Sequence, residues 1–277
     1  MSTDHGGIGN GHDGNSIDEE NIFFIASQKN GVEVIISKDS TETEIQPPVD
    51  CLQNSKSLYF DGHDDKIQIP ISDQLKFGAA QDFTIECRIR TSSASDVSIV
   101  SNKDWDTGLN PGYVMSFRPS SKRWKVNLGD GSSRIDVEGS IINDNEWHTL
   151  SATFDRDGLL KIFDDGHMTG SAAIGNIGNL DTAFPLTIGA DGRGRYAYNG
   201  YISEIRIFNT IVDATAIASW KCKTLDDAHP NYASLIGYWR LNVDPGNSTI
   251  KDSGKFRLDG TLQGATWKDT ICEPTTQ

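Results

Sequence analysis

The sequence predicts an all-β protein with an antiparallel β-sandwich fold, and three observations support this. Asp-Gly occurs seven times and Asn-Gly three times in the 277 residues. Both dipeptides supply the positive φ angles that tight hairpin turns require. Many of the segments between these turns are short and either alternate apolar with polar residues or are rich in β-branched residues. Helix-forming patterns are scarce.

The composition excludes several classes of protein. Hydrophobic residues make up 36% of the chain, which is enough for a core and too much for a disordered chain. The longest unbroken apolar run covers only residues 22–26, whereas a membrane span needs roughly 20 residues. The formal net charge of −14 argues against nucleic acid or an anionic membrane as the main partner, because both would be repelled.

Individual strands follow the period of two. FTIECRIR at 83–90 alternates apolar with polar or charged residues, which predicts a half-buried antiparallel strand. Residues 148–155 and 159–166 flank an Arg-Asp-Gly turn and predict a hairpin. Further along the chain, Ile202 is out of phase with Ile205, which predicts a β-bulge.

One helix and one linker interrupt this pattern. The helix candidate begins at Asp213, a suitable N-cap, and runs to about Cys222. Residues 37–50 are polar, lack periodicity and contain Pro-Pro, which cannot continue a strand ladder. We therefore place a boundary near residue 49, with a short stub and linker at 1–48 and the β-sandwich at 49–277.

Six motifs follow one another from residue 57: SLYFDG at 57–62, FTIECRIR at 83–90, EWHTLSATFD at 146–155, LKIFDDG at 160–166, LTIGAD at 186–191 and NGYISEIRIFN at 199–209. Their order resembles the laminin-G-like and pentraxin-like group of concanavalin-A-like jelly rolls. The resemblance implies a jelly-roll sandwich. It implies no single function, since this fold hosts lectins, adhesion modules, glycosidases and inert spacers.

The C-terminal segment contains three further motifs: LIGYWRLN at 235–242, DSG at 252–254 and LDGTLQGATW at 258–267. They resemble the opening of such domains, which in the family precedes the SLYFDG-type strand. Either a second domain begins here and is cut off, or the domain is circularly permuted. We favour permutation, because adjacent termini permit it and a truncated domain would expose Tyr238, Trp239 and Trp267. Permutation predicts that Trp267 lies near the start of the 57–62 strand.

The segment STDHGGIGNGHDG at 2–14 concentrates imidazole and carboxylate groups, which zinc prefers among ligands other than thiolates. On composition alone, a solvated leader is the alternative. The segment resembles the late metal-binding motif of the alkaline-phosphatase superfamily, in its phosphodiesterase and nucleotide-pyrophosphatase-like branch. The resemblance implies that Asp4 and His5 bind one zinc and His12 its neighbour. Asp13 departs from the motif, because glycine is usual there.

The remainder of a two-zinc phosphoryl-transfer site lies upstream of this motif in that superfamily, including the nucleophilic Thr or Ser. The resemblance therefore implies that the chain is the C-terminal part of a longer enzyme that carries zinc when complete. We expect no catalysis by this chain alone.

The cysteines bear on the compartment and on the permutation. Laminin-G-like domains are typically extracellular or periplasmic, where disulfides form, so we expect the parent protein there. If the domain is permuted, Cys51 and Cys272 flank neighbouring strands and can reach bonding distance. We expect this disulfide, with Cys222 as the competing partner of Cys51. Cys87 alternates with core residues and is expected to be buried.

Aromatic residues in turn-rich loops are the candidates for glycan contacts, because sugars bind to exposed rings with polar neighbours. Trp105 and Tyr113 belong to NKDWDTGLNPGY, and Tyr196 belongs to GRGRYAYNG. For Trp105 the alternative is that it closes the end of the sandwich. Four further aromatic residues are expected in the core: Trp124, Trp147, Tyr198 and Trp239.

Calcium is common in this fold class, and related domains place carboxylates where Asp61, Asp64 and Glu204 stand in this sequence. A solvated Asp-Gly turn is the alternative for Asp61. The spaced carboxylates of concanavalin-A-like glycosidases, E-x-D-x-x-E or E-x-D-x-E, do not occur.

The expected function is therefore a non-catalytic module that binds glycan or another extracellular ligand, or acts as a spacer, in a secreted phosphodiesterase-like enzyme. The alternative is a fragment that completes the site of a zinc-dependent phosphodiesterase or phosphatase.

Overall fold

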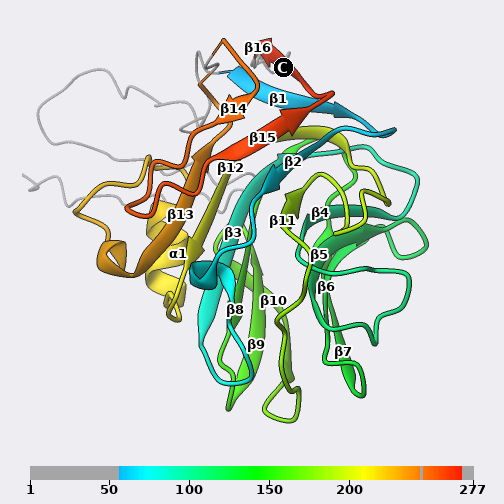
Figure 1. The fold of residues 1–277 in the computed structure, drawn as a ribbon, viewed down its shortest axis with the longest axis vertical. Helices are drawn as coiled ribbons and strands as arrows, with labels where there is room; N and C mark the ends of the chain where they lie inside the picture. The colour runs from blue at the N-terminus through cyan, green and yellow to red at the C-terminus, as the bar shows by residue number, and fades with distance from the viewer. Residues whose placement is uncertain (1–55, 244–245, 270–277) are drawn as a thin grey trace, which may run out of the picture. The chain divides into compact units, whose positions relative to one another are not determined.

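The computed structural model describes residues 56–243 and 246–269. They form two antiparallel sheets packed face to face, which confirms the predicted β-sandwich (Figure 1). Sheet A has the order β10 (His167–Ala173), β9 (Leu159–Asp164), β8 (Trp147–Phe154), β3 (Phe83–Arg90), β12 (Asn199–Phe208), β1 (Lys56–Asp61) and β16 (Thr266–Asp269), and β13 (Leu235–Arg240) also pairs with β12.

Sheet B has the order β14 (Thr249–Ile250), β15 (Gly260–Gln263), β2 (Lys66–Ile69), β11 (Leu186–Ile188), β4 (Val97–Ser101), β5 (Gly112–Arg118), β6 (Arg123–Gly129) and β7 (Arg134–Ile141). The described helices are α1 (Ala214–Trp220) and two 3-10 turns, Asp73–Leu75 and Tyr232–Ser234. Among the described residues, none of these helices has the length and apolarity needed to cross a membrane.

The core lies between the two sheets, where every second residue of each strand points inward. The apolar positions of β3 behave as predicted: Phe83, Ile85, Cys87 and Ile89 are at most 1% exposed. Phe83 stacks on Phe154 of the neighbouring strand, with ring centroids 4.0 Å apart. Burial of such apolar surface is the main stabilising term in a sandwich.

The other face of β3 is also buried, so the prediction of a half-buried strand is wrong. Thr84, Glu86 and Arg88 on this face are 0%, 4% and 6% exposed. The reason is a second apolar cluster on the outer face of sheet A, formed by Phe163, Phe208, Val212, Ala216, Ile217, Leu225, Leu235 and Tyr238. Helix α1 and the residues that follow it cover the polar face of the strand.

Helix α1 begins and packs for identifiable reasons. The Asp213 carboxylate accepts a hydrogen bond from the backbone N–H of Ala216 at 2.9 Å, which confirms the predicted N-cap. The helix lies against the β9–β10 turn, where Asp165 and Gly166 both have positive φ, as the Asp-Gly pattern predicts. A Cβ on Gly166 would lie 2.8 Å from the Cα of Ala218, so this close approach requires glycine.

The C-terminal segment completes the same sandwich. β16 pairs with β1, and Trp267 lies opposite Leu58, which confirms the predicted place of Trp267. Tyr238 and Trp239 of β13 are 3% and 0% exposed. The described residues from 235 onward therefore extend both sheets rather than beginning a second domain.

The predicted bulge is also present, since the register of β12 against β3 shifts between Ile202 and Glu204. Asp4, His5, His12 and the boundary near residue 49 lie outside the described residues, so these predictions stay untested.

Two of the cysteines can be placed. Cys87 is buried with a free thiol, as expected. Cys222 is disulfide-bonded, whereas Cys51 and Cys272 lie outside the described residues. A bond at Cys222 competes with the expected Cys51–Cys272 pair, because the chain has four cysteines and Cys87 is free.

Candidate functional site

Two loops fold over the outer face of sheet B: residues 102–111, between β4 and β5, and residues 189–198, between β11 and β12. Asp191 joins them. Its fully buried carboxylate accepts hydrogen bonds from the backbone N–H groups of Trp105, Arg193 and Arg195, at 3.0, 3.0 and 2.8 Å. Charge-assisted bonds of this kind are the stronger ones, so Asp191 fixes both loops relative to each other.

Trp105 and Tyr196 meet where the two loops touch. Their ring centroids are 4.8 Å apart, so the structure brings together two of the three predicted ligand-binding aromatics. Trp105 is only 9% exposed and lies over Lys125, whose Nζ is 5.4 Å from the ring. Tyr196 is half-buried. Trp105 is therefore a support for the loops, and Tyr196 is the ring that solvent reaches.

A charged cluster surrounds these rings. Arg193 and Arg195 both form ion pairs with Asp104. Burial alone would raise the pKa of Asp104, but the hydrogen bond from Arg193 and the charges of both arginines hold this pKa below its ordinary value. Asp104 is thus ionised at neutral pH, and it crosslinks the loops from the solvent side.

Lys103 lies beneath the loops and is 0% exposed. Its ammonium group donates hydrogen bonds to the Gly108 carbonyl at 3.1 Å and to Asn127 Oδ1 at 2.8 Å. Burial lowers the pKa of Lys103 to about 8, because the charged form loses its hydration. These bonds hold the 102–111 loop down on β6.

A pocket of about 300 Å³ opens beside this loop junction. It is lined by Asp104, Asn110, Pro111 and residues 181–184. Phe184 provides an aromatic ring, and the guanidinium of Arg193 lies 5.4 Å from its centroid. The volume is at the lower end of the range for small-molecule sites. We call Trp105, Tyr196 and this pocket the loop site.

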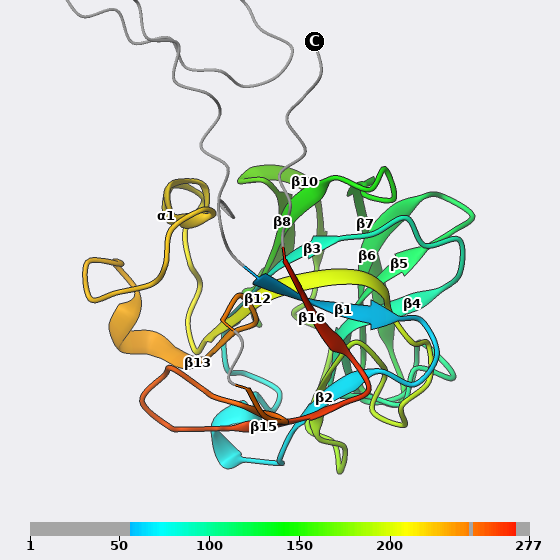
Figure 2. The same cartoon turned by 90° about the horizontal axis from the view of Figure 1, so that it is seen from above.

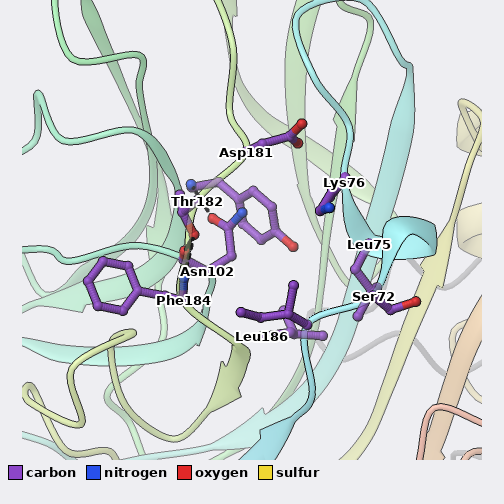
Figure 3. Close-up of a pocket in the computed structure, with 10 residues that line it drawn as sticks. Ser72, Leu75, Lys76, Asn102, Asp181, Thr182, Phe184 and Leu186 are labelled. Atoms are coloured by element: carbon purple, nitrogen blue, oxygen red, sulfur yellow. Dashed lines mark hydrogen bonds between the residues drawn. The ribbon is translucent and has the colours of Figure 1, made fainter.

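A second, smaller cavity shares Asp181, Thr182 and Phe184 with the pocket. Figure 3 shows Leu75 and Ser72 on one side of it and Asn102, Thr182 and Phe184 on the other. Its volume is about 20 Å³, which is room for roughly one water molecule. It is too small for a sugar.

Tyr113 lines this cavity, and its prediction as a ligand-binding residue is wrong. Its side chain is 0% exposed and belongs to the core, because Tyr113 is on the inward face of β5. Its ring centroid lies 5.5 Å from that of Phe83. Among the described residues its hydroxyl has no hydrogen-bond partner.

Of the three calcium candidates, the structure brings only two together. Asp61 ends β1, Asp64 and Asp65 follow in the β1–β2 turn, and one oxygen from each carboxylate lies within 4.8 Å of the others. Burial, together with the charges of Asp61 and Asp64, raises the pKa of Asp65, although the backbone N–H of Asp61 opposes this.

Glu204 is not part of that cluster, so its prediction as a calcium ligand is wrong. It forms an ion pair with Arg206 at 2.6 Å and accepts a hydrogen bond from the Tyr238 hydroxyl at 2.9 Å. The β12 bulge and the cover by α1 place Glu204 in a buried ion-pair network instead.

His148 is a polar group that the sequence analysis missed. Its ring lies between Asp164, 3.0 Å from Nδ1, and Asp144, 3.1 Å from Nε2. Burial by itself lowers the pKa of His148, but the two carboxylates outweigh burial and raise it to about 9. The hydroxyl of Ser140 in β7 also donates to Asp164 in β9, so the cluster links sheet B to sheet A. No local motif marks His148, because its partners come from other strands.

With this geometry described, the chain can be compared with known proteins. The Laminin_G_3 family, described as the concanavalin A-like lectin/glucanases superfamily, matches residues 61–218. A search of curated proteins finds no relative of this sequence.

Similar solved structures include a candidate carbohydrate binding protein from Bacteroides ovatus ATCC 8483, with 19% identity and a TM-score of 0.60. That match covers 78% of this chain and 60% of that protein, so this chain spans less than two thirds of its length.

A SAP-like pentraxin from Limulus polyphemus has 14% identity and a TM-score of 0.46, with 62% of this chain and 84% of that chain covered. Domains LG4-5 of the mouse laminin alpha1 chain have 16% identity and a TM-score of 0.45, with 57% and 43% covered. At 19% identity, the match to the Bacteroides ovatus protein bears on the fold alone. The family match covers more than half of the sequence, and the chain therefore belongs to the Laminin_G_3 family of the concanavalin A-like lectin/glucanases superfamily.

Proposed function

We propose that this chain is a non-catalytic glycan-binding module and that the loop site holds the saccharide. The observation that carries the proposal is the pocket of about 300 Å³, which places the Phe184 ring next to Asp104, Asn110 and Thr182. Sugars present apolar C–H faces and many hydroxyls, so a ring beside fixed polar groups suits them. The Bacteroides ovatus protein, described as carbohydrate binding, supports the same ligand class.

The loop site is built before any ligand arrives. Asp191 and Lys103 fix the loops from below, and the arginine pairs on Asp104 fix them from above. A site that is already ordered loses less conformational entropy on binding, which favours affinity for a flexible oligosaccharide.

An array of neutral and acidic oligosaccharides, with calorimetry on each ligand that binds, tests this proposal. We expect Phe184→Ala and Tyr196→Ala to weaken binding at least tenfold without changing the unfolding midpoint. Met168→Ala is the matched control, because Met168 is 59% exposed on β10 of the other sheet. Equal binding by Phe184→Ala and the wild type would contradict the proposed site.

Calcium at the β1–β2 turn is a second part of the proposal. Three carboxylates within 4.8 Å of one another are hard oxygen donors of the kind that calcium prefers, and a cation would offset their mutual repulsion. We expect 1 mM CaCl₂ to raise the unfolding temperature relative to EDTA, and Asp64→Asn to remove this shift. An unchanged unfolding temperature in the wild type would count against a structural ion.

The parent protein is proposed to be a secreted, phosphodiesterase-like enzyme, on the basis of residues 2–14 alone. We expect this chain with added zinc to leave a nitrophenyl phosphodiester unhydrolysed, since the nucleophile is expected upstream. Measurable turnover would favour the alternative, a phosphodiesterase or phosphatase function in this chain.

An extracellular or periplasmic location is proposed on the family resemblance and the cysteines. Peptide mapping without reduction tests it and also decides the pairing among Cys51, Cys222 and Cys272. Free thiols at all four cysteines in protein from the native compartment would argue against this location.

A further inference from the structure

One row of side chains crosses four neighbouring strands on the outer face of sheet A. In register, Trp147 of β8 lies opposite Arg90 of β3, Arg90 opposite Tyr201 of β12, and Tyr201 opposite Tyr59 of β1. Figure 2 shows β8, β3, β12 and β1 side by side in this order. We call these four residues the Arg90 row. With strands about 4.8 Å apart, the row is about 14 Å long.

The Arg90 row is the part of this face that the helix cover leaves accessible. Glu86 and Arg206, further along the same face, are 4% and 1% exposed beneath the α1 cluster. All four members of the row are half-buried instead. Trp147 is therefore not a core residue, which corrects its prediction as one of the core aromatic residues. Phe154, which lies seven residues further along β8, is on the opposite, core-facing side.

The guanidinium of Arg90 contacts two aromatic rings, whose centroids are 6.3 Å apart. Its Cζ is 4.5 Å from the centroid of Tyr201 and 5.8 Å from that of Trp147. Tyr59 extends the aromatic surface, with its centroid 5.0 Å from that of Tyr201. Contact with both rings holds the guanidinium in one orientation and leaves its N–H donors for another acceptor.

Arg90 differs from Arg206, on the same face, in its electrostatic surroundings. Arg206 is paired with Glu86 and Glu204, and Arg88 donates to Thr149 Oγ1 at 3.1 Å. Arg90 forms no ion pair with a described residue, and its Nε is buried without a hydrogen-bond partner there. A guanidinium without a carboxylate partner among the described residues is complementary to an acidic ligand.

We propose that the Arg90 row is a second saccharide site, selective for an acidic sugar such as a uronic acid. The guanidinium of Arg90 binds the sugar carboxylate, a group whose two oxygens match its N–H donors. The accessible parts of the Trp147 and Tyr201 rings contact apolar C–H groups of the oligosaccharide. The site goes beyond the proposed function, because it lies on the other sheet and is selective for acidic sugars.

Calorimetry on the full chain with trigalacturonate, and with galactotriose as the neutral counterpart, tests this proposal. We expect trigalacturonate to bind and galactotriose to bind at least tenfold more weakly at this site. Arg90→Gln and Trp147→Ala should each weaken trigalacturonate binding at least tenfold. Arg90→Lys should also weaken it, because lysine keeps the charge but loses the planar pair of donors. Added salt should lower the affinity.

Arg118→Gln is the matched control, because Arg118 is an exposed arginine at the end of β5 on the other sheet. It should bind trigalacturonate as the wild type does, and all variants should keep the wild-type unfolding midpoint. Arg90→Gln with unchanged affinity, or equal affinities for the two trisaccharides, would overturn the inference. If Phe184→Ala lost trigalacturonate binding and Arg90→Gln kept it, the binding would belong to the loop site. That outcome would also overturn the inference. Binding that depends on Arg90 while Phe184→Ala has no effect on any ligand would support this site and reject the loop site.

Discussion

Strands of both sheets share the same alternating sequence pattern, but the outer faces of the two sheets are covered in different ways. On sheet A, helix α1 covers Glu86, Glu204 and Arg206, and an apolar cluster seals the ion pairs from water. On sheet B, two loops cover Lys103 and Asn127, and they are held by polar contacts to Asp191. The loop-covered face has a pocket of about 300 Å³.

The difference shows how a sandwich can separate stability from binding. A helix brings its own apolar face, so its cover is dry and contributes to stability. Loops bring backbone N–H and carbonyl groups, which need polar partners and leave gaps that a ligand can enter. The Arg90 row lies on sheet A at the place where the helical cover ends.

The largest expected effect is on the helix-covered face. Arg206→Met should lower the free energy of unfolding by about 3–5 kcal/mol, because it leaves Glu86 and Glu204 buried without a counterion. It also removes the bonds from Arg206 to the carbonyls of Trp220 and Lys223, which hold the end of α1. Urea denaturation measures the loss. Arg118→Met is the exposed control, and a loss below about 1 kcal/mol for Arg206→Met would mean that the network is not stabilising in this way.

The next largest expected effect concerns His148, whose cluster links the two sheets. The pKa of His148 is raised from 6.5 to about 9, so the folded state binds the proton more tightly than the unfolded state. This contribution is fully present below about pH 6.5 and is lost as pH rises to about 9, up to about 3 kcal/mol in total. The pKa of Lys103 is instead lowered to about 8, so the contribution of Lys103 to the pH dependence of stability has the opposite sign. Stability curves of the wild type and His148→Gln from pH 6 to 9 isolate the histidine, and parallel curves would contradict the assignment.

A smaller effect should follow at the loop-covered face. Asp191→Asn removes a charged acceptor of three backbone N–H groups and should cost about 2 kcal/mol. It should also shift the Trp105 fluorescence to the red and weaken binding at the loop site. Asp252→Asn is matched to it, because Asp252 is equally buried and accepts from the N–H groups of Tyr238, Gly254 and Leu258. If both variants changed ligand binding equally, Asp191 would have no specific role at the loop site.

The smallest expected effect is the difference in stability between variants of two buried tyrosines, Tyr113 and Tyr238. Tyr113→Phe should change the free energy of unfolding by less than about 1 kcal/mol, because the hydroxyl bonds to no described residue. Tyr238→Phe should cost more, since that hydroxyl donates to the Glu204 carboxylate at 2.9 Å. The difference between the two denaturation midpoints is the measurement. Equal losses would show that Tyr113 has a partner of similar strength.

Local sequence was a good guide wherever a short-range rule decides the outcome. The alternation in 83–90 identified the core face of β3, Asp213 was recognised as an N-cap, and Asp165-Gly166 was recognised as a turn. The order of the motifs along the sequence, and not only the motifs themselves, predicted that Trp267 lies beside β1. For the loop site, Trp105 and Tyr196 were identified because turn-rich loops that contain aromatic residues stand out locally.

What the sequence by itself determined is therefore the fold class, most strand faces and two aromatic residues of the loop site, because each depends on neighbours a few residues away. The tertiary structure alone decided what covers each outer face. It buried Tyr113, paired Glu204 with Arg206, joined His148 to Asp164 and aligned Trp147, Arg90, Tyr201 and Tyr59. The physical reason is that charge pairing and burial depend on groups brought together from distant strands, and no local pattern records which strands become neighbours.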